Sequence, residues 1–368
     1  MKKLKIAMIH PAVGSSNGGS QTFVVELSKY LAEKCDIDIL ASSEETDQCK
    51  KIGCIPRLKA LNSTEIHINL LNKFLKNFFN KPEIIIEHFS AFFPTVVHLL
   101  LNRYDVLYPN NDWGGLLACW VVRKIKGTPI VFTEHSSLMN DGKIAERNLK
   151  FKPDKYITLS SHMKDWVDNN FENINTEHIP NGINFEKFNP YINGIKLPLE
   201  GPIILASARY QTNKRLELAV DAVEKLGYGS LLVLSNGEGV DFLKKYGMSK
   251  LGKKRFKLLS VPYEEIQHYY KSCDIFTLPS EFEPFGLVYL EAMACNKPIV
   301  ATDDESRREI IGDAGILCNP ENIEEYADTL KKALQTTFKN KPYERAKLFD
   351  WKLISDKYFA VFEDVKKK

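Results

Sequence analysis

The sequence has neither the paired cysteines of a disulfide-rich or zinc-binding protein nor the large net charge of a nucleic-acid-binding protein. Its seven cysteines are an odd number, and no two of them have C-x-x-C spacing. This pattern disfavours a disulfide framework and a zinc or thioredoxin-like motif, so we expect reduced, buried cysteines in a cytoplasmic protein. The formal net charge is only +3, whereas a nucleic-acid-binding protein would usually carry a larger or more clustered excess.

Long hydrophobic runs are also missing. No apolar stretch approaches the ~20 residues that a membrane-spanning helix needs. The first residues are basic and then apolar, but the apolar part is too short for a signal peptide and leads into a polar glycine loop. The composition, 44% hydrophobic and 26% charged, is otherwise that of a soluble globular protein.

The length of 368 residues suits two domains of roughly 150 to 200 residues each. Short apolar runs alternate with helical patterns, for example over Thr22–Cys35 and Gly114–Ile125. This alternation predicts parallel sheets covered by helices on both faces. We expect strands at Leu4–Ile9, Ile37–Leu40, Ile84–Glu87, Val106–Tyr108, Ile130–Thr133, Tyr156–Leu159, Ile203–Ser207, Leu231–Leu234, Phe256–Leu259, Ile275–Leu278 and Ile299–Thr302.

A polar stretch over residues 179–199, punctuated by Pro, Asn and Gly, separates the two halves and is the expected linker. We predict a Rossmann-like N-terminal domain over residues 1–185 and a second over 186–345. A helix over 346–368 is expected to pack back on the N-terminal domain. Two such domains in tandem would face each other across a deep cleft, with ligands at the carboxyl ends of the strands.

The densest chemical signal is the run Leu278–Ala294. A strand is expected to end there at a turn containing Gly286, and a helix begins near Leu287. The unpaired N–H groups and partial positive charge of a helix start suit a diphosphate. Glu283 and Glu291 flank this start and can accept hydrogen bonds from sugar and ribose hydroxyls. Alternatively, they only decorate a helix start, where acids are favoured in any case.

The run from Pro279 to Ala301 resembles the E-x7-E signature of the retaining glycosyltransferase family 4, which has the GT-B fold. Four further segments follow that family's order along the chain. They are Gly18-Gly19 after the first strand, Thr133-Glu134-His135 after an N-domain strand, the interdomain stretch Ile179–Asn184, and the R-x4-K pair Arg209 and Lys214. Each element is weak alone, but their shared order is hard to obtain by chance.

The resemblance implies an N-terminal domain that binds the acceptor and a C-terminal domain that binds the nucleotide sugar. Arg209 and Lys214 would hold the diphosphate. Glu283 would contact hydroxyls of the donor sugar, and Glu291 would contact the ribose. The other implied positions are Gly19 and His135, facing the reacting sugar; Val261 and Pro262, contacting the base through the backbone; and Phe285, Gly286, Leu287 and Val288, whose amides would surround the phosphates. The residues expected to act in catalysis are His135, Arg209, Lys214 and Glu283.

The activity implied is retaining transfer of a sugar from a UDP- or GDP-linked donor to a hydroxyl of a glycan, lipid-linked or small-molecule acceptor. No cofactor is expected. Two fixed cations can stabilise the departing diphosphate, so no metal is required either. The alternatives are a nucleotide-sugar epimerase of the same fold and a non-catalytic nucleotide-sugar-binding protein. A phosphorylase would need a much longer chain.

The sequence departs from the family pattern at several positions where that family usually has glycine. Ala208 precedes the arginine of the R-x4-K pair, Arg215 follows its lysine, and Asn296 stands where another glycine is usual. The loop usually rich in glycine is the charged run Asp303–Glu309 here. Because that loop lies near the donor sugar in this fold, its charge leaves the identity of the donor open.

Three other signals compete with this interpretation. Asp36-Ile37-Asp38 has the D-x-D pattern of a metal site, but we expect it to be structural at the start of a strand. Gly237-Glu238-Gly239 lacks the third glycine of a dinucleotide fingerprint, because Phe242 stands there. Residues 66–81 form an apolar and a Lys/Asn-rich helical face. That helix either packs on the core or lies peripherally on the inner face of an anionic membrane.

Overall fold

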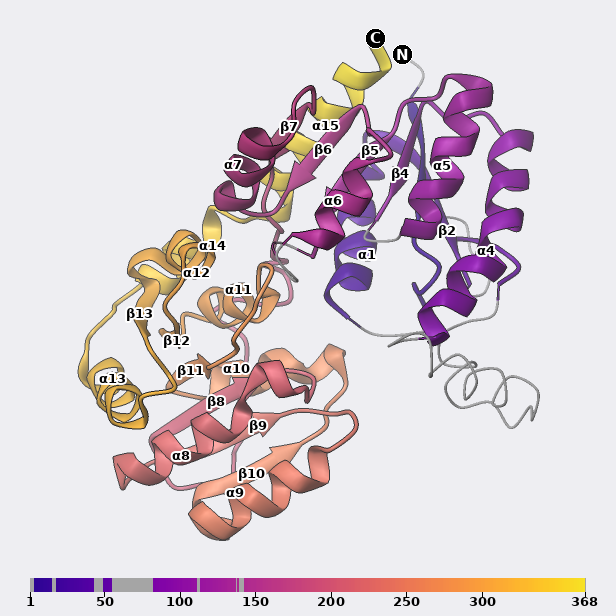
Figure 1. The fold of residues 1–368 in the computed structure, drawn as a ribbon. Coiled ribbons are helices and arrows are strands. Elements are labelled where there is room, and N and C mark those ends of the chain that lie inside the picture. The colour runs from indigo at the N-terminus through magenta and orange to yellow at the C-terminus, as the bar shows by residue number, and fades with distance from the viewer. Residues whose placement is uncertain are drawn as a thin grey trace, which may run out of the picture. The chain divides into compact units, whose positions relative to one another are not determined.

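The computed structural model describes residues 3–14, 18–42, 49–54, 82–110, 113–136, 138 and 142–367. The chain forms two compact units (Figure 1). Unit 1 comprises Met1–Pro180 with Trp351–Lys368, and unit 2 comprises Asn181–Asp350. The chain therefore passes between the units twice, at residues 180–181 and 350–351, whereas the boundaries expected from the sequence are 185–186 and 345–346.

Unit 1 is built on parallel strands. One sheet has the order β3-β2-β1-β4 and a second run has the order β5-β6-β7. Isolated parallel bridges pair Leu107 with Ile130 and Asn110 with Thr133, so the second run continues the first. The strands are β1 (Leu4–Ile9), β2 (Cys35–Ala41), β3 (Cys49–Lys51), β4 (Val106–Pro109), β5 (Val131–Glu134), β6 (Lys155–Thr158) and β7 (Thr176–His178).

The helices of unit 1 connect these strands. They are α1 (Gly19–Leu31), α4 (Pro82–Leu101), α5 (Trp113–Lys126), α6 (Lys143–Leu149), α7 (Ser161–Asn170) and α15 (Trp351–Lys367). The predicted helix Gly114–Ile125 is confirmed as α5. The helix predicted over Thr22–Cys35 ends earlier, at Leu31, because Cys35 is already the first residue of β2. The helix expected over residues 66–81 lies outside the described residues.

Helix α4 corrects two sequence predictions. The strand predicted at Ile84–Glu87 is wrong, because these residues form the start of this 20-residue helix. Periodicity alone cannot separate a short apolar strand from the beginning of an apolar helix. The helix also contains an 18-residue window, Ile84–Leu101, that is long and apolar enough to cross a membrane and of which only 33% is buried. The expectation that no such run exists was therefore too strict.

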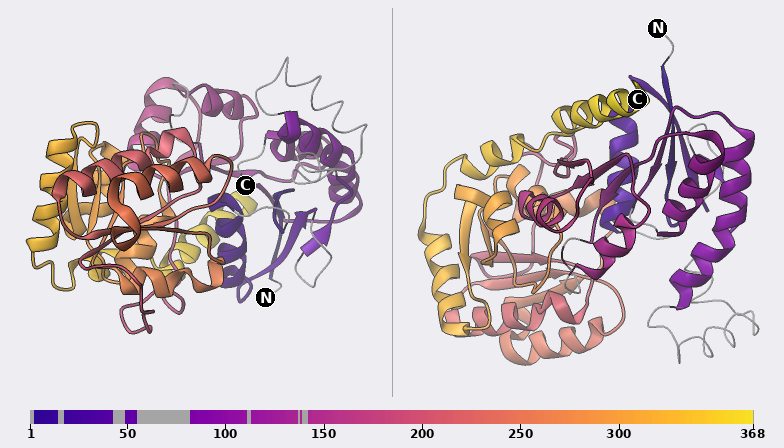
Figure 2. Two further views of the ribbon diagram at one scale, coloured as in Figure 1. Left: turned by 90° about the horizontal axis from the view of Figure 1, so that it is seen from below. Right: turned by 45° about the horizontal axis from the view of Figure 1, so that its top comes forward.

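Helix α15 belongs to unit 1 although unit 2 precedes it in the chain. Trp351, Tyr358 and Phe362 are buried in the same hydrophobic cluster as Phe23 of α1. The rings of Phe23 and Trp351 lie 5.6 Å apart. Two further views show α15 (yellow) beside α1 (Figure 2). The core of unit 1 is thus completed by residues 351–367.

Unit 2 contains one six-stranded parallel sheet in the order β10-β9-β8-β11-β12-β13. The strands are β8 (Ile203–Ser207), β9 (Ser230–Leu234), β10 (Phe256–Leu259), β11 (Ile275–Leu278), β12 (Ile299–Thr302) and β13 (Gly315–Cys318). Numbered along the chain, this order is the 3-2-1-4-5-6 arrangement of doubly wound nucleotide-binding folds. All five strands predicted for this half are confirmed, and β13 is additional.

Helices and 3-10 turns link the strands of unit 2. They are η1 (Thr212–Lys214), α8 (Leu216–Leu226), α9 (Val240–Arg255), η2 (Tyr263–Glu265), α10 (Ile266–Ser272), α11 (Leu287–Ala294), α12 (Glu305–Ile311), η3 (Gly312–Ala314), α13 (Ile323–Gln335) and α14 (Lys341–Lys347). The helix predicted to begin near Leu287 is confirmed as α11. The fold thus consists of two Rossmann-like units, as the sequence predicts.

Candidate active site

The sheet of unit 2 has a topological switch point between β8 and β11. β8 has β9 on one side and β11 on the other, so the loops that follow β8 and β11 turn away from each other. Ligands of doubly wound sheets bind at the carboxyl ends of the strands at such a point. These two loops, residues 208–215 and 279–286, carry five of the eleven predicted donor-binding residues: Arg209, Lys214, Glu283, Phe285 and Gly286.

The loop after β8 carries the two predicted diphosphate-binding cations, which have different surroundings. Arg209 is exposed, and its guanidinium has no ion pair or hydrogen bond within the described part of the chain. Lys214 ends the turn η1, and its side chain is only 16% exposed. Its Nζ lies 2.6 Å from Oε2 of Glu283. One cation is therefore open to an incoming anion, and the other is already paired.

The loop after β11 holds Glu283 from two sides. Besides the ion pair with Lys214, the hydroxyl of Ser280 donates to the same Oε2 of Glu283 over 3.2 Å. The backbone N–H of Glu281 donates to the carbonyl of Asn213 over 2.8 Å, which ties the two loops together. The side chain of Glu283 is 12% exposed, so its carboxylate is held in one position by these contacts and is mostly shielded from solvent.

Gly286 links this loop to α11 in a conformation that requires glycine. Its φ is +80°, in the left-handed region. A Cβ atom there would lie 2.5 Å from the ring of Tyr289 and 2.8 Å from Cγ of Glu283. The bare backbone thus allows Glu283 to approach the helix start.

The start of α11 offers unpaired backbone donors. No side chain caps the helix, and its first turn contains no acidic residue. Phe285 is buried, whereas Leu287 and Val288 are half-buried. The first N–H groups of a helix have no partner within the helix, which makes this position suited to a phosphate.

Glu291 lies deeper than the sequence suggests. It is 5% exposed, and its Oε2 accepts a hydrogen bond from the hydroxyl of Tyr270 over 2.7 Å. Burial raises the pKa of the Glu291 carboxyl above its usual range, and the hydrogen bond from Tyr270 and the charge of Lys187 oppose that rise. The contact between Glu291 and a ribose stays a prediction.

The segment after β10 contains the predicted base-contacting residues. Val261 is half-buried and Pro262 is exposed, and the turn η2 follows directly. The ammonium of Lys187 lies 3.0 Å from the ring centroid of Tyr263 and donates to its carbonyl oxygen over 2.6 Å. Lys187 and Tyr263 therefore brace the segment next to Val261 and Pro262.

Two departures from the family's glycines have a structural explanation. Arg215 and Asn296 both adopt positive φ, +48° and +57°, the conformation that glycine would provide without strain. The side chain of Asn296 donates to the carbonyl of Lys339 over 3.1 Å, and its oxygen accepts from the backbone N–H of Tyr343. Each side chain thus makes contacts that a glycine could not.

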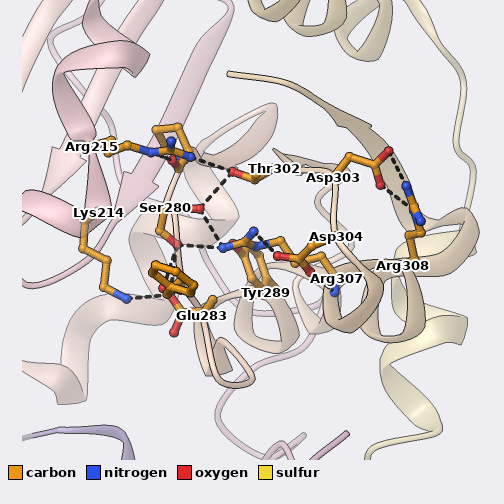
Figure 3. A network of polar contacts seen from close by, with 12 residues as sticks. Lys214, Arg215, Ser280, Glu283, Tyr289, Thr302, Asp303, Asp304, Arg307 and Arg308 are labelled. Atoms are coloured by element: carbon orange, nitrogen blue, oxygen red, sulfur yellow. Dashed lines mark hydrogen bonds and ion pairs between the residues drawn. The ribbon is translucent and has the colours of Figure 1, made fainter. Parts of the chain in front are cut away.

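The charged run 303–309 forms the start of α12. Asp304 caps the helix by accepting from the backbone N–H of Arg307 over 2.8 Å. Asp303 and Arg308 form an exposed ion pair at 2.6 Å. Figure 3 shows that Arg307 points toward Ser280 and Tyr289, next to the pair of Lys214 and Glu283. The acidic residues are therefore engaged locally, and the buried arginine reaches the site.

The predicted residues Gly19 and His135 lie in unit 1. Gly19 is the first residue of α1, and His135 follows β5 with its ring 4.7 Å from that of Phe23. Burial, and next the charge of the nearby His10, lower the pKa of His135 to about 3. Its buried Nε2 has no hydrogen-bond partner among the described residues. His135 is thus an uncharged polar group at the carboxyl end of the unit 1 sheet.

In the D-x-D pattern, the contacts of Asp38 are consistent with the structural role that we expect. Asp38 in β2 accepts a hydrogen bond from Tyr104 over 2.9 Å and pairs with Lys5 at 3.4 Å. Among residues that the structure describes, no group of three or more His, Cys, Asp or Glu could hold a metal ion.

Comparison with known proteins agrees with this geometry. The protein family described as "glycosyl transferases group 1" matches residues 188–348, and the family described as "glycosyltransferase family 4" matches residues 17–187. An uncharacterized glycosyltransferase of Methanocaldococcus jannaschii is 26% identical over 95% of each chain. A D-inositol 3-phosphate glycosyltransferase of Xylanimonas cellulosilytica is 23% identical over 87% of this chain and 84% of the relative.

Among solved structures, HepE of Anabaena in complex with UDP and glucose has a TM-score of 0.72 at 16% identity. The match covers 98% of this chain and 100% of that one. The fold and the two consecutive matches define a glycosyltransferase of the GT-B type. The chain belongs to glycosyltransferase family 4.

Several residues around the site are not among those that the sequence predicts. Ser280 stands inside the motif turn but carries no signal of its own. Arg307 is noticeable only as part of a charged run. Tyr270 and Lys187 contact or approach Glu291 from segments 21 and 104 residues away in sequence. Only their contacts in the folded chain identify them.

Proposed function

We propose that this glycosyltransferase moves a sugar from a nucleoside diphosphate donor to an acceptor hydroxyl with retention at the anomeric carbon. The observation that carries the proposal is the ion pair of Lys214 and Glu283 at the switch point, 2.6 Å apart, with the start of α11 beside it. A cation and a helix start suit the diphosphate, whereas a fixed carboxylate suits sugar hydroxyls.

In the proposed reaction the bond between the anomeric carbon and the diphosphate oxygen breaks, and that oxygen keeps the electron pair. The acceptor oxygen bonds to the same face of the sugar, and its proton passes to the departing diphosphate. Arg209, Lys214 and the start of α11 stabilise the charge that develops on the leaving group. These cations supply the stabilisation that a metal ion would otherwise provide, so the proposed route uses neither a metal nor a cofactor.

We propose that His135 contacts the donor sugar. A group with a pKa of about 3 is uncharged at neutral pH. It can therefore share a hydrogen bond with a sugar hydroxyl without adding a positive charge that would repel a developing oxocarbenium ion. Gly19 leaves the start of α1 without a side chain and is proposed to face the same sugar.

For the acceptor we propose a lipid-linked molecule presented at an anionic membrane surface. Four apolar side chains spaced four residues apart line the exposed face of α4. They are Phe89, Phe93, Val97 and Leu101, with exposed fractions of 65%, 72%, 53% and 80%. Single exposed apolar residues are common, but an exposed stripe along one helix marks a contact surface.

Positive charge accompanies this stripe. Arg103, Lys124 and Lys126 are exposed where α4 and α5 end. Lys126 donates to the carbonyl of Leu99 over 2.9 Å, so the two helix ends lie side by side. An apolar stripe beside clustered cations suits the interface of a bilayer that contains anionic lipids.

A melting screen against UDP, GDP and their sugar conjugates would identify the donor, because a ligand that binds only the folded chain raises its stability. The decisive test then compares Glu283→Gln with the neighbouring control Glu281→Gln. Loss of a charged hydrogen-bond acceptor should lower transfer by roughly 10- to 100-fold. Affinity for the nucleoside diphosphate should not fall, because the variant frees Lys214 from its ion pair. The control should behave as the unmodified protein.

Normal transfer by Glu283→Gln would overturn the role of Glu283. Interconversion of the donor sugar without an acceptor would identify an epimerase instead. A melting shift with no turnover toward any acceptor would identify a binding protein.

A further inference from the structure

Two arginines converge on the turn that carries Glu283. Nε of Arg215 donates to the carbonyl of Pro279 over 2.8 Å. Nη2 of Arg307 donates to the carbonyl of Ser280 over 2.7 Å and to its hydroxyl over 3.1 Å. Both arginines stand in segments where the family usually has glycine, yet they contact adjacent residues of one turn (Figure 3).

Arg307 is the more unusual of the two, because its side chain is fully buried. Besides Ser280, it donates to the hydroxyl of Tyr289 over 3.1 Å and pairs with Asp304. Its partner Asp304 is 38% exposed, so the guanidinium loses its hydration while the ion pair is only partly withdrawn from water. Such a pair is often no more stabilising than apolar side chains of the same volume. Stability alone therefore does not account for a guanidinium here, whereas the geometry of its rigid fork of donors does.

Ser280 connects this guanidinium to Glu283. A serine hydroxyl has a single hydrogen to donate. Arg307 donates to the oxygen of that hydroxyl, which leaves the hydrogen for an acceptor. The Glu283 carboxylate is a charged acceptor with Oε2 at 3.2 Å, nearer than the carbonyl of Phe282 at 3.5 Å. The chain of contacts thus runs from Arg307 through Ser280 to Glu283.

Arg215 and Thr302 fix the other side of the turn. The hydroxyl of Thr302 donates to the carbonyl of Ser280 over 2.9 Å. Arg215 approaches that hydroxyl at 3.4 Å and pairs with Glu321 at 2.7 Å. The carbonyl of Ser280 therefore accepts from both Thr302 and Arg307, which leaves the turn little freedom to rotate.

We propose that Arg307 is a positioning residue for the donor sugar, acting through Ser280 on the carboxylate of Glu283, and that Arg215 braces the same turn from its other side. The proposal rests on the proposed function, in which Glu283 contacts hydroxyls of the donor sugar. A carboxylate held in one direction accepts from hydroxyls in one arrangement only. In this chain the two arginines therefore take part in selecting the sugar, while the nucleoside diphosphate is held by other groups.

The test measures, by calorimetry, how much more tightly the protein binds a nucleotide sugar than the bare nucleotide, with UDP-glucose against UDP and GDP-mannose against GDP. In Arg307→Met and in Ser280→Ala this advantage should fall about tenfold, the loss expected for one hydrogen bond to a charged group. Affinity for the bare nucleotide should stay within about twofold. Arg308→Met, which removes only the exposed pair with Asp303, is the matched control and should change neither.

A double-mutant cycle separates positioning from a general structural role. Because Arg307 acts through Glu283, Arg307→Met combined with Glu283→Gln should lose no more of the advantage than Glu283→Gln alone. Additive losses, or an equal fall in both affinities, would overturn the proposal. If Glu283→Gln binds the nucleotide sugar over the bare nucleotide as well as the unmodified protein does, Glu283 does not contact the sugar. In that case the proposed function fails, whereas the claim that the two arginines hold the turn is not affected.

Amide hydrogen exchange tests the brace without any ligand. In Arg307→Met the amides of residues 280–286 should exchange about tenfold faster than in the unmodified protein, because the turn loses its fixed partner. Arg307→Lys keeps the charge but not the fork, so it should restore only part of the protection. Unchanged exchange of this turn in Arg307→Met would refute the brace.

Discussion

The ammonium of Lys214 lies 2.6 Å from a carboxylate oxygen of Glu283, and both side chains are mostly withdrawn from solvent. In this structure the lysine expected to meet the diphosphate is neutralised by the acid expected to meet the sugar. A donor that enters must compete with Glu283 for Lys214. The pair therefore holds both groups in place before a ligand arrives, at the expense of some affinity for the phosphate.

Removal of Lys214 should affect both binding and stability. Lys214→Met takes a partner from a carboxylate that is 12% exposed, which should cost about 1–3 kcal/mol of unfolding free energy. Diphosphate affinity should fall roughly 10- to 100-fold. Urea unfolding and calorimetry with UDP or GDP measure the two effects. Lys254→Met, at an exposed surface pair, is the control, and an equal loss there would argue against a specific role.

Arg209 should behave differently, because its guanidinium has no partner among the described residues. Arg209→Met should leave the unfolding free energy within about 0.5 kcal/mol of the original value. It should still lower diphosphate affinity by roughly 10- to 100-fold. A stable variant with unaltered affinity would exclude Arg209 from the phosphate site.

Gly286 should tolerate no side chain. Gly286→Ala must place a Cβ 2.5 Å from the ring of Tyr289 at a φ of +80°. We expect a loss of about 2–5 kcal/mol, of which about 1–2 comes from the left-handed backbone and the rest from the clash. Gly227→Ala is the control, since its φ is +81° with nothing within 4 Å. Equal losses in urea unfolding would mean that the clash relaxes freely.

His135 should make stability depend on pH on the acid side. Its pKa is lowered from 6.5 to about 3 in the folded chain, so the unfolded chain binds the additional proton. The contribution of His135 to the free energy of unfolding is fully present above pH 6.5. It declines as the pH falls from 6.5 toward 3, by up to about 1.4 kcal/mol per pH unit. His135→Asn should flatten that decline in urea unfolding between pH 7.5 and 5. An identical slope in both proteins would show that His135 does not titrate this way.

The apolar stripe of α4 should determine binding to vesicles. Phe93→Ser removes a side chain that is 72% exposed, and it should weaken binding to phosphatidylglycerol vesicles by about tenfold or more. Phe242→Ser, at a 59% exposed phenylalanine of unit 2, is the control and should change nothing. Equal binding by both variants, or no binding by the unmodified protein, would contradict the membrane proposal.

Much of the fold follows from local sequence patterns. β1, β8, β10, β11 and β12 begin and end where the sequence predicts, because each is a short, mainly apolar run. All but β10 are also largely buried. β3 and β7 lack that signal, since Cys49-Lys50-Lys51 and Thr176-Glu177-His178 are short and largely polar. The start of α4 differs from the prediction because the three consecutive isoleucines Ile84–Ile86 fit a strand as well as a helix.

The features of the candidate site also fall into two groups, those that the local sequence indicates and those that it does not. The turn at Gly286 and the start of α11 are local features, so the sequence indicates both. The approach of Arg307 to Ser280 and of Tyr270 to Glu291 depends on contacts between separate strands and helices. No spacing in the sequence encodes such contacts, although a charged run in place of glycine marks the segment where one of them arises.

The position of α15 also bears on the order in which the chain folds as it is synthesised. Unit 2 is a continuous segment and has all its strands once residue 350 has emerged. Unit 1 has its strands by residue 178 but lacks Trp351, Tyr358 and Phe362. At ~5–20 residues per second, roughly 10–35 s separate these two points. During that interval the apolar surface of α1 is uncovered, so the half of the enzyme made first is completed last and is the half that would need a chaperone.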